Sequence, residues 1–283
     1  MATTLSRPAA RAASAAPARR PRRQSWLRRH VVQIFAAVAL LYMFLPVAYV
    51  IAFSFNNPSD RYNSTWNSFT FSNWTDVCGP AGVCDSLKLS LEIGALATLG
   101  ATVLGTLIAF ALARRRFGGR ATTNLLIFLP MATPEVVMGS SLLTLFVNLQ
   151  VPLGFWTIVI AHITFDISFV VVTVKARLQG LDSRLEQAAM DLYANEWQTF
   201  RRITFPLVFP GILGAALLAF SLSFDDFIIT NFNSGQTVTF PMFVWGASLR
   251  SIPPQVNVVG SIMFVASLGL ALVGQVFYRR RRA

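Results

Sequence analysis

The sequence is poor in the residues that metal and redox sites require. Among its 283 residues it has two cysteines and two histidines, too few for a zinc cluster, an iron–sulfur cluster or a disulfide-stapled scaffold. Lysine occurs only as Lys88 and Lys175, and neither follows a glycine. The phosphate-binding pattern G-x-x-x-x-G-K is therefore missing. We expect this chain to bind no metal and no cofactor, so that any ATP and Mg it depends on are bound by a partner chain.

Charge is also scarce, and long hydrophobic runs take its place. Charged residues make up 13% of the chain and hydrophobic residues 54%, a composition that suits a bilayer better than water. Runs of about 20 residues can cross a hydrocarbon core of ~30 Å. Six such runs are approximately Val31–Phe55, Leu87–Ala113, Asn124–Leu149, Leu153–Val174, Leu207–Phe232 and Val256–Tyr278. The predicted fold class is an all-α membrane protein whose six transmembrane helices occupy residues 31–278.

The basic residues are divided unevenly between the two sides of this predicted bundle. Of the 24 Lys and Arg residues, 21 fall in the two terminal segments and the second and fourth connections, and 3 fall in the opposite loops. Because cytoplasmic loops retain Lys and Arg, we expect both termini in the cytoplasm. The net charge of +12 then reflects topology and attraction to anionic membrane lipid, and nucleic acid is not an expected partner.

The two ends of the chain are basic and polar. Residues 1–30 are rich in Ala, Arg, Pro and Ser and contain no acidic residue, which predicts a disordered cytoplasmic tail. An organelle transit peptide has a similar composition and remains an alternative. Residues 279–283 form a short basic cytoplasmic C-terminus.

The longest predicted outer loop, residues 56–86, is too short for an independent catalytic domain. It contains both cysteines, Cys78 and Cys84, separated by the turn-forming residues Gly79-Pro80-Ala81-Gly82. This turn can bring the two sulfurs together on the oxidising side of the membrane. A local disulfide is predicted, and two unpaired thiols are the alternative.

The connection 175–205 is long and patterned, and it predicts two short helices. Ser183 with Glu186 has the spacing of a capping box, and Asn195 with Gln198 repeats it. Apolar residues then follow on one face of each helix: Leu185, Ala188, Ala189 and Leu192 in the first, and Trp197, Phe200 and Ile203 in the second. Such short helices are not stable alone. We expect the segment to dock against a partner protein, with a helix lying on the membrane surface as the alternative.

This segment resembles the cytoplasmic signature of the membrane permeases of ATP-binding-cassette (ABC) importers. That signature is E-A-A, three residues, G, nine residues, I-x-L-P, and here it reads Gln187-Ala188-Ala189, then Tyr193, then Ile203-Thr204-Phe205-Pro206. Gln187 stands in place of the acid, with Glu186 one position earlier, and Tyr193 stands in place of the glycine. Because glycine adopts a positive φ without steric penalty, we expect the turn at Tyr193 either to be rebuilt or to weaken coupling.

Other segments resemble the second-permease type of spermidine/putrescine importers. They are Pro134–Gly139, Leu153–Trp156, Ala161–Phe165, Glu186–Leu192, Phe220–Ile228 and Pro254–Asn257. The resemblance implies a MetI-like type I ABC importer permease in a bacterial inner membrane, which is not itself an enzyme. It also implies a second permease subunit, two ATPase subunits and an extracytoplasmic solute-binding protein as partners.

The resemblance further implies that the first short helix and the stretch after it couple the permease to an ATPase. The coupling residues so implied are Glu186, Gln187, Ala188, Ala189, Asp191, Leu192, Tyr193, Ala194, Trp197 and Phe200. We therefore expect this stretch to insert into a groove of one ATPase subunit and to move when the ATPase dimer closes.

Acidic residues inside the predicted spans give clues to the solute, because a charge there costs about 2.5–3.5 kcal/mol on insertion scales. Five acids lie in the spans, whereas no Lys or Arg lies deep in one, which favours a cation such as a polyamine. The expected pathway residues are Asp225, Asp226, Glu135, Ser223 and Trp245, the last as a cation–π contact. Asp225 and Asp226 project about 100° apart on a helix, so we expect one of them to face the pathway.

Asp166 is expected to have a structural role instead. His162 lies four residues earlier on the same helical face, and a pair at that spacing satisfies both groups within one helix.

The sequence thus predicts a permease subunit of an ATP-driven, binding-protein-dependent importer for polyamines, which forms half of the translocation pathway. Two alternatives stay open: an ABC importer permease for another small solute, and a proton-coupled secondary transporter that uses the acids as a relay. A membrane enzyme is disfavoured because no group of His, Cys or Ser residues suited to catalysis is present.

Overall fold

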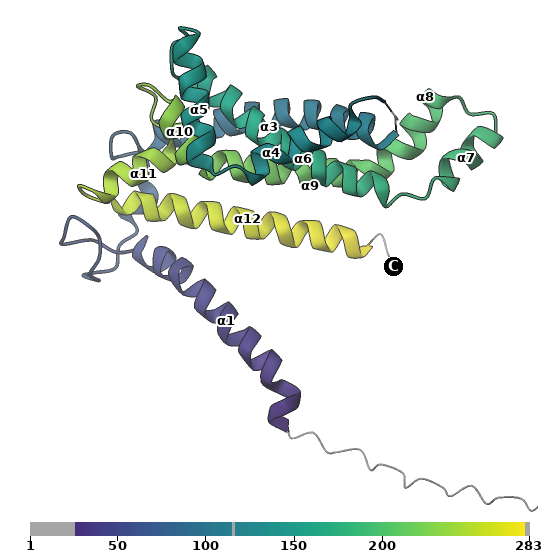
Figure 1. Ribbon diagram of the computed structural model, residues 1–283. Helices are drawn as coiled ribbons and strands as arrows, with labels where there is room; N and C mark the ends of the chain where they lie inside the picture. The colour runs from purple at the N-terminus through teal and green to yellow at the C-terminus, as the bar shows by residue number, and fades with distance from the viewer. Residues whose placement is uncertain (1–25, 115–116, 281–283) are drawn as a thin grey trace, which may run out of the picture. The chain divides into compact units, whose positions relative to one another are not determined.

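The computed structural model describes residues 26–114 and 117–280. Within these residues every regular element is a helix, from α1 (Trp26–Phe53) to α12 (Pro254–Arg280) (Figure 1). The chain divides into two compact units, Met1–Tyr49 and Val50–Ala283. The predicted tail 1–30 lies mostly outside the described residues, and so do the last three residues of the predicted segment 279–283.

The first unit contains most of helix α1. This helix begins at Trp26, earlier than the predicted start at Val31, and includes Pro46 in its interior. Its apolar side chains are exposed within this unit, with Val32 76% and Tyr42 77% accessible. A helix that is hydrophobic all round requires lipid or protein about it.

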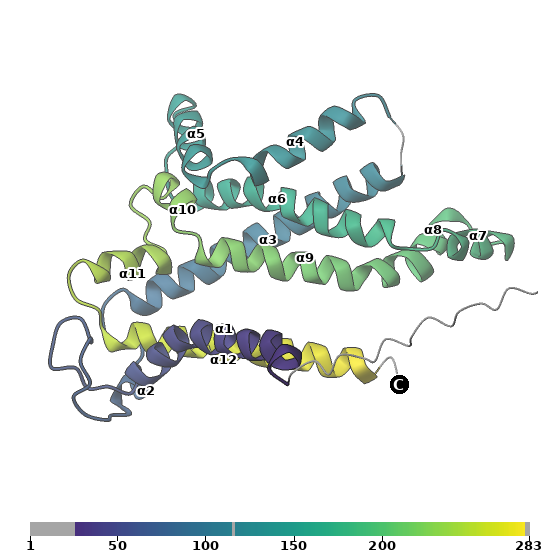
Figure 2. The same ribbon diagram turned by 60° about the horizontal axis from the view of Figure 1, so that its bottom comes forward.

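Three long helices form the core of the second unit. These are α3 (Val83–Arg114), α6 (Phe155–Gln179) and α9 (Phe205–Asp225), which lie side by side in both views (Figures 1 and 2). Helix α3 buries small residues at every fourth position: Ala97, Ala101, Gly105 and Ala109. At Gly105 a Cβ atom would lie 2.7 Å from Cγ1 of Val170 on α6. The small side chains therefore allow the close approach of helices that is typical of membrane bundles.

The predicted span Asn124–Leu149 is not a single straight helix. It consists of α4 (Arg120–Ala132) and α5 (Glu135–Asn148), which meet at an angle of 108°. Thr133 has extended backbone angles, as expected for a residue that precedes a proline. Pro134 therefore ends α4 and sets the bend.

The predicted span Leu207–Phe232 also ends early. Helix α9 stops at Asp225 because Asp226 is extended, with φ −65° and ψ 126°. The chain then forms α10 (Ile228–Asn233) and α11 (Phe240–Ser248). At the other end of α9, the chain enters it through α8 (Glu196–Thr199) and the π-helix η1 (Phe200–Thr204), and Pro206 lies in the first turn of α9 as predicted.

Two short helical groups lie at opposite ends of the α3–α6–α9 bundle. Helices α7 (Arg184–Asp191) and α8 lie at one end, and α10 and α11 lie at the other (Figures 1 and 2). We call these the α7–α8 end and the α10–α11 end.

Four helices in the described part of the chain are long and apolar enough to cross a membrane, and the bent pair α4 and α5 would make five. The four are His30–Phe53, Val83–Arg114, Phe155–Gln179 and Glu196–Asp225. Within the residues searched, the apolar part of α12 is shorter, Pro254–Leu270. The total of six spans therefore stays a prediction.

The loop before α3 has a polar interior of its own. Asn56 is completely buried, and its Nδ2 donates hydrogen bonds to Asn63 Oδ1 at 2.7 Å and to the Thr65 carbonyl at 2.8 Å. After the short helix α2 (Ser72–Thr75), a disulfide joins Cys78 and Cys84, whose Cα atoms are 5.2 Å apart. These bonds order the loop although it contains little regular structure.

Candidate functional site

The two short helices predicted in the connection 175–205 are present as α7 and α8. The second capping box forms as predicted, because Asn195 Oδ1 accepts from the Gln198 backbone N–H and Gln198 Oε1 accepts from the Asn195 N–H. The first predicted box is wrong. Ser183 already has helical backbone angles and makes no capping hydrogen bond, so it does not have the extended geometry of an N-cap, and Glu186 binds elsewhere.

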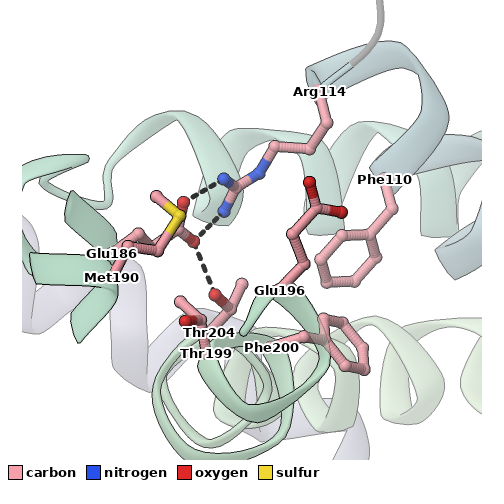
Figure 3. A pocket seen from close by; sticks show the side chains of 8 residues that line it. All are labelled: Phe110, Arg114, Glu186, Met190, Glu196, Thr199, Phe200 and Thr204. Carbon is pink, nitrogen blue, oxygen red and sulfur yellow. Dashed lines mark hydrogen bonds and ion pairs between the residues drawn. The ribbon is translucent and has the colours of Figure 1, made fainter. Parts of the chain in front are cut away.

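Glu186 connects α7 to the ends of two longer helical segments. Its carboxylate accepts hydrogen bonds from both terminal nitrogens of Arg114, the last residue of α3. It also accepts one from the Thr204 hydroxyl of η1 at 2.5 Å, and Figure 3 shows the three side chains converging. The bonds from Arg114 hold the pKa of Glu186 below its usual value, against the opposing effect of burial. Glu186 is therefore ionised at neutral pH, and the two-point contact fixes the orientation of Arg114.

This ion pair forms one side of a pocket of about 460 Å³. The opposite side is aromatic, with the rings of Phe110 and Phe200 5.5 Å apart (Figure 3). The pocket is lined by Phe110, Arg114, Glu186, Met190, Glu196, Thr199, Phe200 and Thr204. Two of these residues come from η1, and π-helical turns inside longer helices often occur at functional sites.

The turn between α7 and α8 is built with Tyr193 in the left-handed conformation, at φ 65°. The Tyr193 N–H donates to the Met190 carbonyl at 2.9 Å, and the Ala194 N–H donates to the Ala189 carbonyl at 3.1 Å. This is the Schellman arrangement, in which glycine usually occupies the left-handed position. The turn of the glycine signature is thus kept, at a conformational cost of roughly 1 kcal/mol for tyrosine.

Large apolar side chains of this segment are exposed to solvent. Leu192 is 82% accessible, Tyr193 98% and Trp197 66%, and we call these three residues the α7–α8 patch. The other predicted coupling residues divide by burial: Gln187, Ala188 and Asp191 are exposed, Ala194 and Phe200 are half-buried, and Ala189 is buried. Several large apolar side chains exposed on one short segment are typical of an interaction surface.

A second pocket, of about 510 Å³, lies at the α10–α11 end. It is lined by Phe224, Asp225, Phe227, Phe240, Pro241, Val244, Trp245 and Ser248. Asp225 supplies the carboxylate, and Phe227 and Trp245 supply aromatic rings whose centres are 5.4 Å apart. A carboxylate beside aromatic faces suits an organic cation. The structure thus brings together two of the five predicted pathway residues, Asp225 and Trp245.

Two other predicted pathway residues lie in a buried network instead. His162 Nδ1 is 2.5 Å from Ser223 Oγ, and His162 Nε2 is 2.9 Å from Thr230 Oγ1 and 3.3 Å from Asp226 Oδ2. The expected pair of His162 with Asp166 is wrong, because the imidazole turns toward α9 and α10. Both carboxylate oxygens of Asp166 are buried without a hydrogen-bond partner among the described residues.

The fifth predicted residue, Glu135, is exposed in the first turn of α5, directly after the bend at Pro134. It does not line the pocket that contains Asp225. Among the described residues, no group of three or more His, Cys, Asp or Glu residues could hold a metal ion.

Residues 101–282 match the family described as "Binding-protein-dependent transport system inner membrane component". This range contains the α7–α8 segment, both pockets and the helix break after Asp225. The chain belongs to this family. It is thus an inner-membrane permease of the ABC importer type, as the sequence predicted, and family members are transport subunits.

Curated relatives of the permease extend this result beyond the family match. The "Spermidine/putrescine transport system permease protein PotC" of Haemophilus influenzae is 34% identical over 247 residues, which is 87% of this chain and 95% of that protein. The "Putrescine transport system permease protein PotI" of Escherichia coli strain K12 is 33% identical over 242 residues, 82% of this chain and 85% of that protein.

Solved structures share the fold of the permease. A bacterial ABC transporter involved in the import of the acidic polysaccharide alginate aligns with a TM-score of 0.63 and 17% identity, over 92% of this chain and 99% of that one. An amino acid ABC transporter aligns with a TM-score of 0.56 and 17% identity, over 74% of this chain and 96% of that one. At these identities the likeness concerns the fold alone.

Sequence reasoning missed three contributors to the two sites. Arg114 and Thr204 are the partners of Glu186. In the sequence, Arg114 is only one of the basic residues that indicate topology, and Thr204 is only a variable position of the signature. His162 was paired with the wrong acid. One signal was available for Arg114, because it ends an apolar run at the side of the membrane where Glu186 was expected.

Proposed function

We propose that this permease imports polyamines, such as spermidine and putrescine, in an ATP-driven complex. The observation that carries the proposal is the 34% identity to the spermidine/putrescine permease of Haemophilus influenzae across 87% of this chain. The pocket at the α10–α11 end supports it independently of that identity. Asp225 can bind an ammonium group there while the faces of Trp245 and Phe227 contact the alkyl chain.

The solute meets Asp225 and Trp245 near the outer mouth of the pathway. Asp226 and Ser223 do not line the pocket. They support it through the buried network that they form with His162. Glu135, exposed at the bend between α4 and α5, is a further acid for the solute to meet. Because the charged side chains proposed for the pathway are all negative, they attract cations and repel anions.

The proposed complex contains a second permease, two ATPase subunits that bind ATP and Mg, and an extracytoplasmic solute-binding protein. The α7–α8 patch and Ala188 dock on one ATPase subunit. Because Glu186 binds both Arg114 and Thr204, a displacement of α7 is passed directly to α3 and, through η1, to α9. This connection converts closure of the ATPase dimer into movement of the spans.

The sidedness of the proposal follows from charge. The α7–α8 end and both termini are cytoplasmic, because 21 of 24 basic residues fall on that side of a six-span arrangement. The α10–α11 end and the disulfide loop then face the outside.

The test is uptake into lipid vesicles that contain the complete complex, with ATP supplied to the ATPase subunits. We expect ATP-dependent uptake of labelled spermidine or putrescine and none of amino acids or sugars. ATP-dependent uptake of another solute but not of polyamines would favour the alternative of a different ABC importer. Uptake driven by a proton gradient without ATPase subunits would support a secondary transporter instead.

A further inference from the structure

We propose that His162 is a positioning residue of the transport pathway. It holds Asp226 inside the bundle and fixes the end of α9, so that Asp225 alone presents its carboxylate to the pocket with Trp245. The inference rests on the proposed function, because it assigns a specificity role at the same pocket.

The imidazole of His162 contacts both sides of the helix break. Ser223, at 2.5 Å from Nδ1, lies in the last turn of α9, and Thr230, at 2.9 Å from Nε2, lies in α10. Asp226, 3.3 Å from Nε2, lies between them. One side chain of α6 thus holds the end of α9, the break and the start of α10.

A single neutral tautomer satisfies the whole network. The Thr230 hydroxyl donates to Asp226 Oδ2 at 2.8 Å, so its oxygen is free to accept from His162 Nε2–H. The Ser223 hydroxyl then donates to the unprotonated Nδ1. Every member has a partner, and the side chains of His162 and Asp226 are only 3% and 7% accessible. A fully satisfied buried network of this kind selects one arrangement.

Asp226 is held from the other side by the backbone of α10. Its carboxylate accepts from the Thr230 N–H at 2.7 Å and from the Ile229 N–H at 3.3 Å. Helix α10 is itself fixed to its neighbours, since Asn233 Nδ2 donates to the Gly139 carbonyl of α5 at 3.3 Å and the Thr157 hydroxyl of α6 donates to the Asn233 carbonyl at 2.7 Å. The end of α9 is therefore attached to a fixed group of helices through His162.

The consequence concerns Asp225, one residue before the break. The two adjacent aspartates divide the roles: Asp226 binds within the network, whereas Asp225 lines the pocket with Trp245. Without the imidazole, the end of α9 loses its polar attachment to α6, and Thr230, which donates to the carboxylate of Asp226, loses its contact with α6. The position of Asp225 in the pocket would then vary, and recognition of the cation would weaken.

The first experiment measures position without any solute. Both native cysteines are joined in the disulfide, so Asp225→Cys introduces the only free thiol of this chain, and its labelling by a cationic, membrane-impermeant reagent is measured on the permease subunit after the complete complex is separated into its chains. We expect His162→Gln in this background to slow labelling at least threefold. The control Ser168→Ala alters another buried polar residue of α6 that makes none of the bonds of the network, and it should leave the rate unchanged. An unchanged rate with His162→Gln would overturn the proposal.

The second experiment is a double-mutant cycle on spermidine uptake by the complex. We expect His162→Gln and Asp225→Asn each to raise KM roughly tenfold, and the double variant to be no worse than Asp225→Asn alone, because the two changes remove the same contact. If KM of the double variant rises by the product of the two single increases, His162 does not act through Asp225. If His162→Gln fails to assemble, Ser223→Ala removes one bond of the network and should show the same lack of additivity.

The labelling and uptake experiments together distinguish failure of this inference from failure of the proposed function. If the wild-type complex takes up no polyamine, the proposed function fails, but the labelling experiment still decides whether His162 positions residue 225. If polyamine uptake is normal in the wild type and in His162→Gln, the proposed function stands and the positioning role is wrong.

Discussion

The two ends of the helical bundle satisfy their polar groups in different ways. At the α7–α8 end, the pair formed by Arg114 and Glu186 is partly open to solvent, with side chains 41% and 15% accessible, and large apolar side chains point outward beside it. At the α10–α11 end, His162, Ser223 and Thr230 are buried and the exposed charge, Asp225, lies among aromatic rings. The first end exposes apolar side chains that suit contact with another chain, whereas these buried polar groups at the second end are satisfied within this chain.

This difference has a physical consequence for mutations. Solvent-exposed ion pairs contribute little to stability, so changes at the α7–α8 end should act mainly on association with the ATPase. Buried polar networks are costly to break, so changes around Asp226 should act on the fold, and changes at Asp225 on the solute.

The largest effect should follow from Ala188→Asp on the exposed face of α7. An unpaired charge placed in a protein interface costs about 2–5 kcal/mol, which corresponds to a loss of ATPase association of at least about thirtyfold. Copurification of the ATPase with the permease measures it. Ser183→Asp adds the same charge at the start of α7, where the helix dipole favours it, and should be much milder. Normal ATPase association of the Ala188→Asp complex would refute the docking assignment.

The two adjacent aspartates at the α10–α11 end provide the next comparison. Asp225→Asn should raise KM for spermidine by about tenfold while the melting temperature stays unchanged, because only the pocket loses a charge. Asp226→Asn should lower the free energy of unfolding by about 1–3 kcal/mol, because the backbone N–H and the hydroxyl of Thr230 lose a charged acceptor. Uptake kinetics and thermal unfolding of both variants test this, and the opposite assignment of effects would contradict the described network.

Glu186 should give a smaller effect that depends on pH. Its pKa is lowered in the folded protein by Arg114, so its contribution to stability is present at neutral pH and is lost as pH falls through the folded pKa, below about 4.5. Glu186→Gln should therefore lower the melting temperature by about 2 °C at pH 7 and by less in acid. Glu196→Gln, in the same pocket, is the matched control. If Glu186→Gln lowers the melting temperature by the same amount at pH 7 and in acid, the ionised carboxylate of Glu186 does not contribute to stability.

The smallest effect should be a gain in stability from Tyr193→Gly. Glycine adopts the φ of 65° found at this position without the steric cost, and Tyr193, being 98% exposed, has almost no packing in this chain to lose. We expect the free energy of unfolding to rise by about 0.5–1 kcal/mol. Ala194→Gly, at a residue outside the left-handed region, should instead lower it. If both variants lower it, the turn is not strained at Tyr193.

Features that depend on nearby residues could be predicted from the sequence, and features that depend on distant ones could not. The cap joins Asn195 and Gln198, which are three residues apart, and it was predicted correctly, as was the helical character of the described residues. The bond from Arg114 to Glu186 joins residues 72 apart, and the contact of His162 with Ser223 joins residues 61 apart. Sequence spacing carries no information on such pairs.

The helix breaks show the same limit. Pro130 and Pro134 predict an interruption of the third span, which occurs at Pro134, but the angle of 108° between α4 and α5 depends on how each helix packs. No proline or glycine near Asp225 signals the end of α9, and the hydropathy of the sequence predicts a span that continues to Phe232. Charge and aromatic type alone single out Asp225 and Trp245 as residues suited to a cation, but the sequence does not predict that both line one pocket.

The central claim is that the permease receives its motion from an ATPase through the α7–α8 patch. Because both native cysteines are joined in the disulfide, Leu192→Cys places a single thiol in the patch, where Leu192 is 82% exposed. The rate of labelling by an aqueous thiol reagent should fall at least tenfold when the complete complex assembles, and a short bifunctional cross-linker should join this position to the ATPase subunit. Equal labelling rates in the isolated permease and in the transporting complex, with no cross-link to the ATPase, would contradict the account.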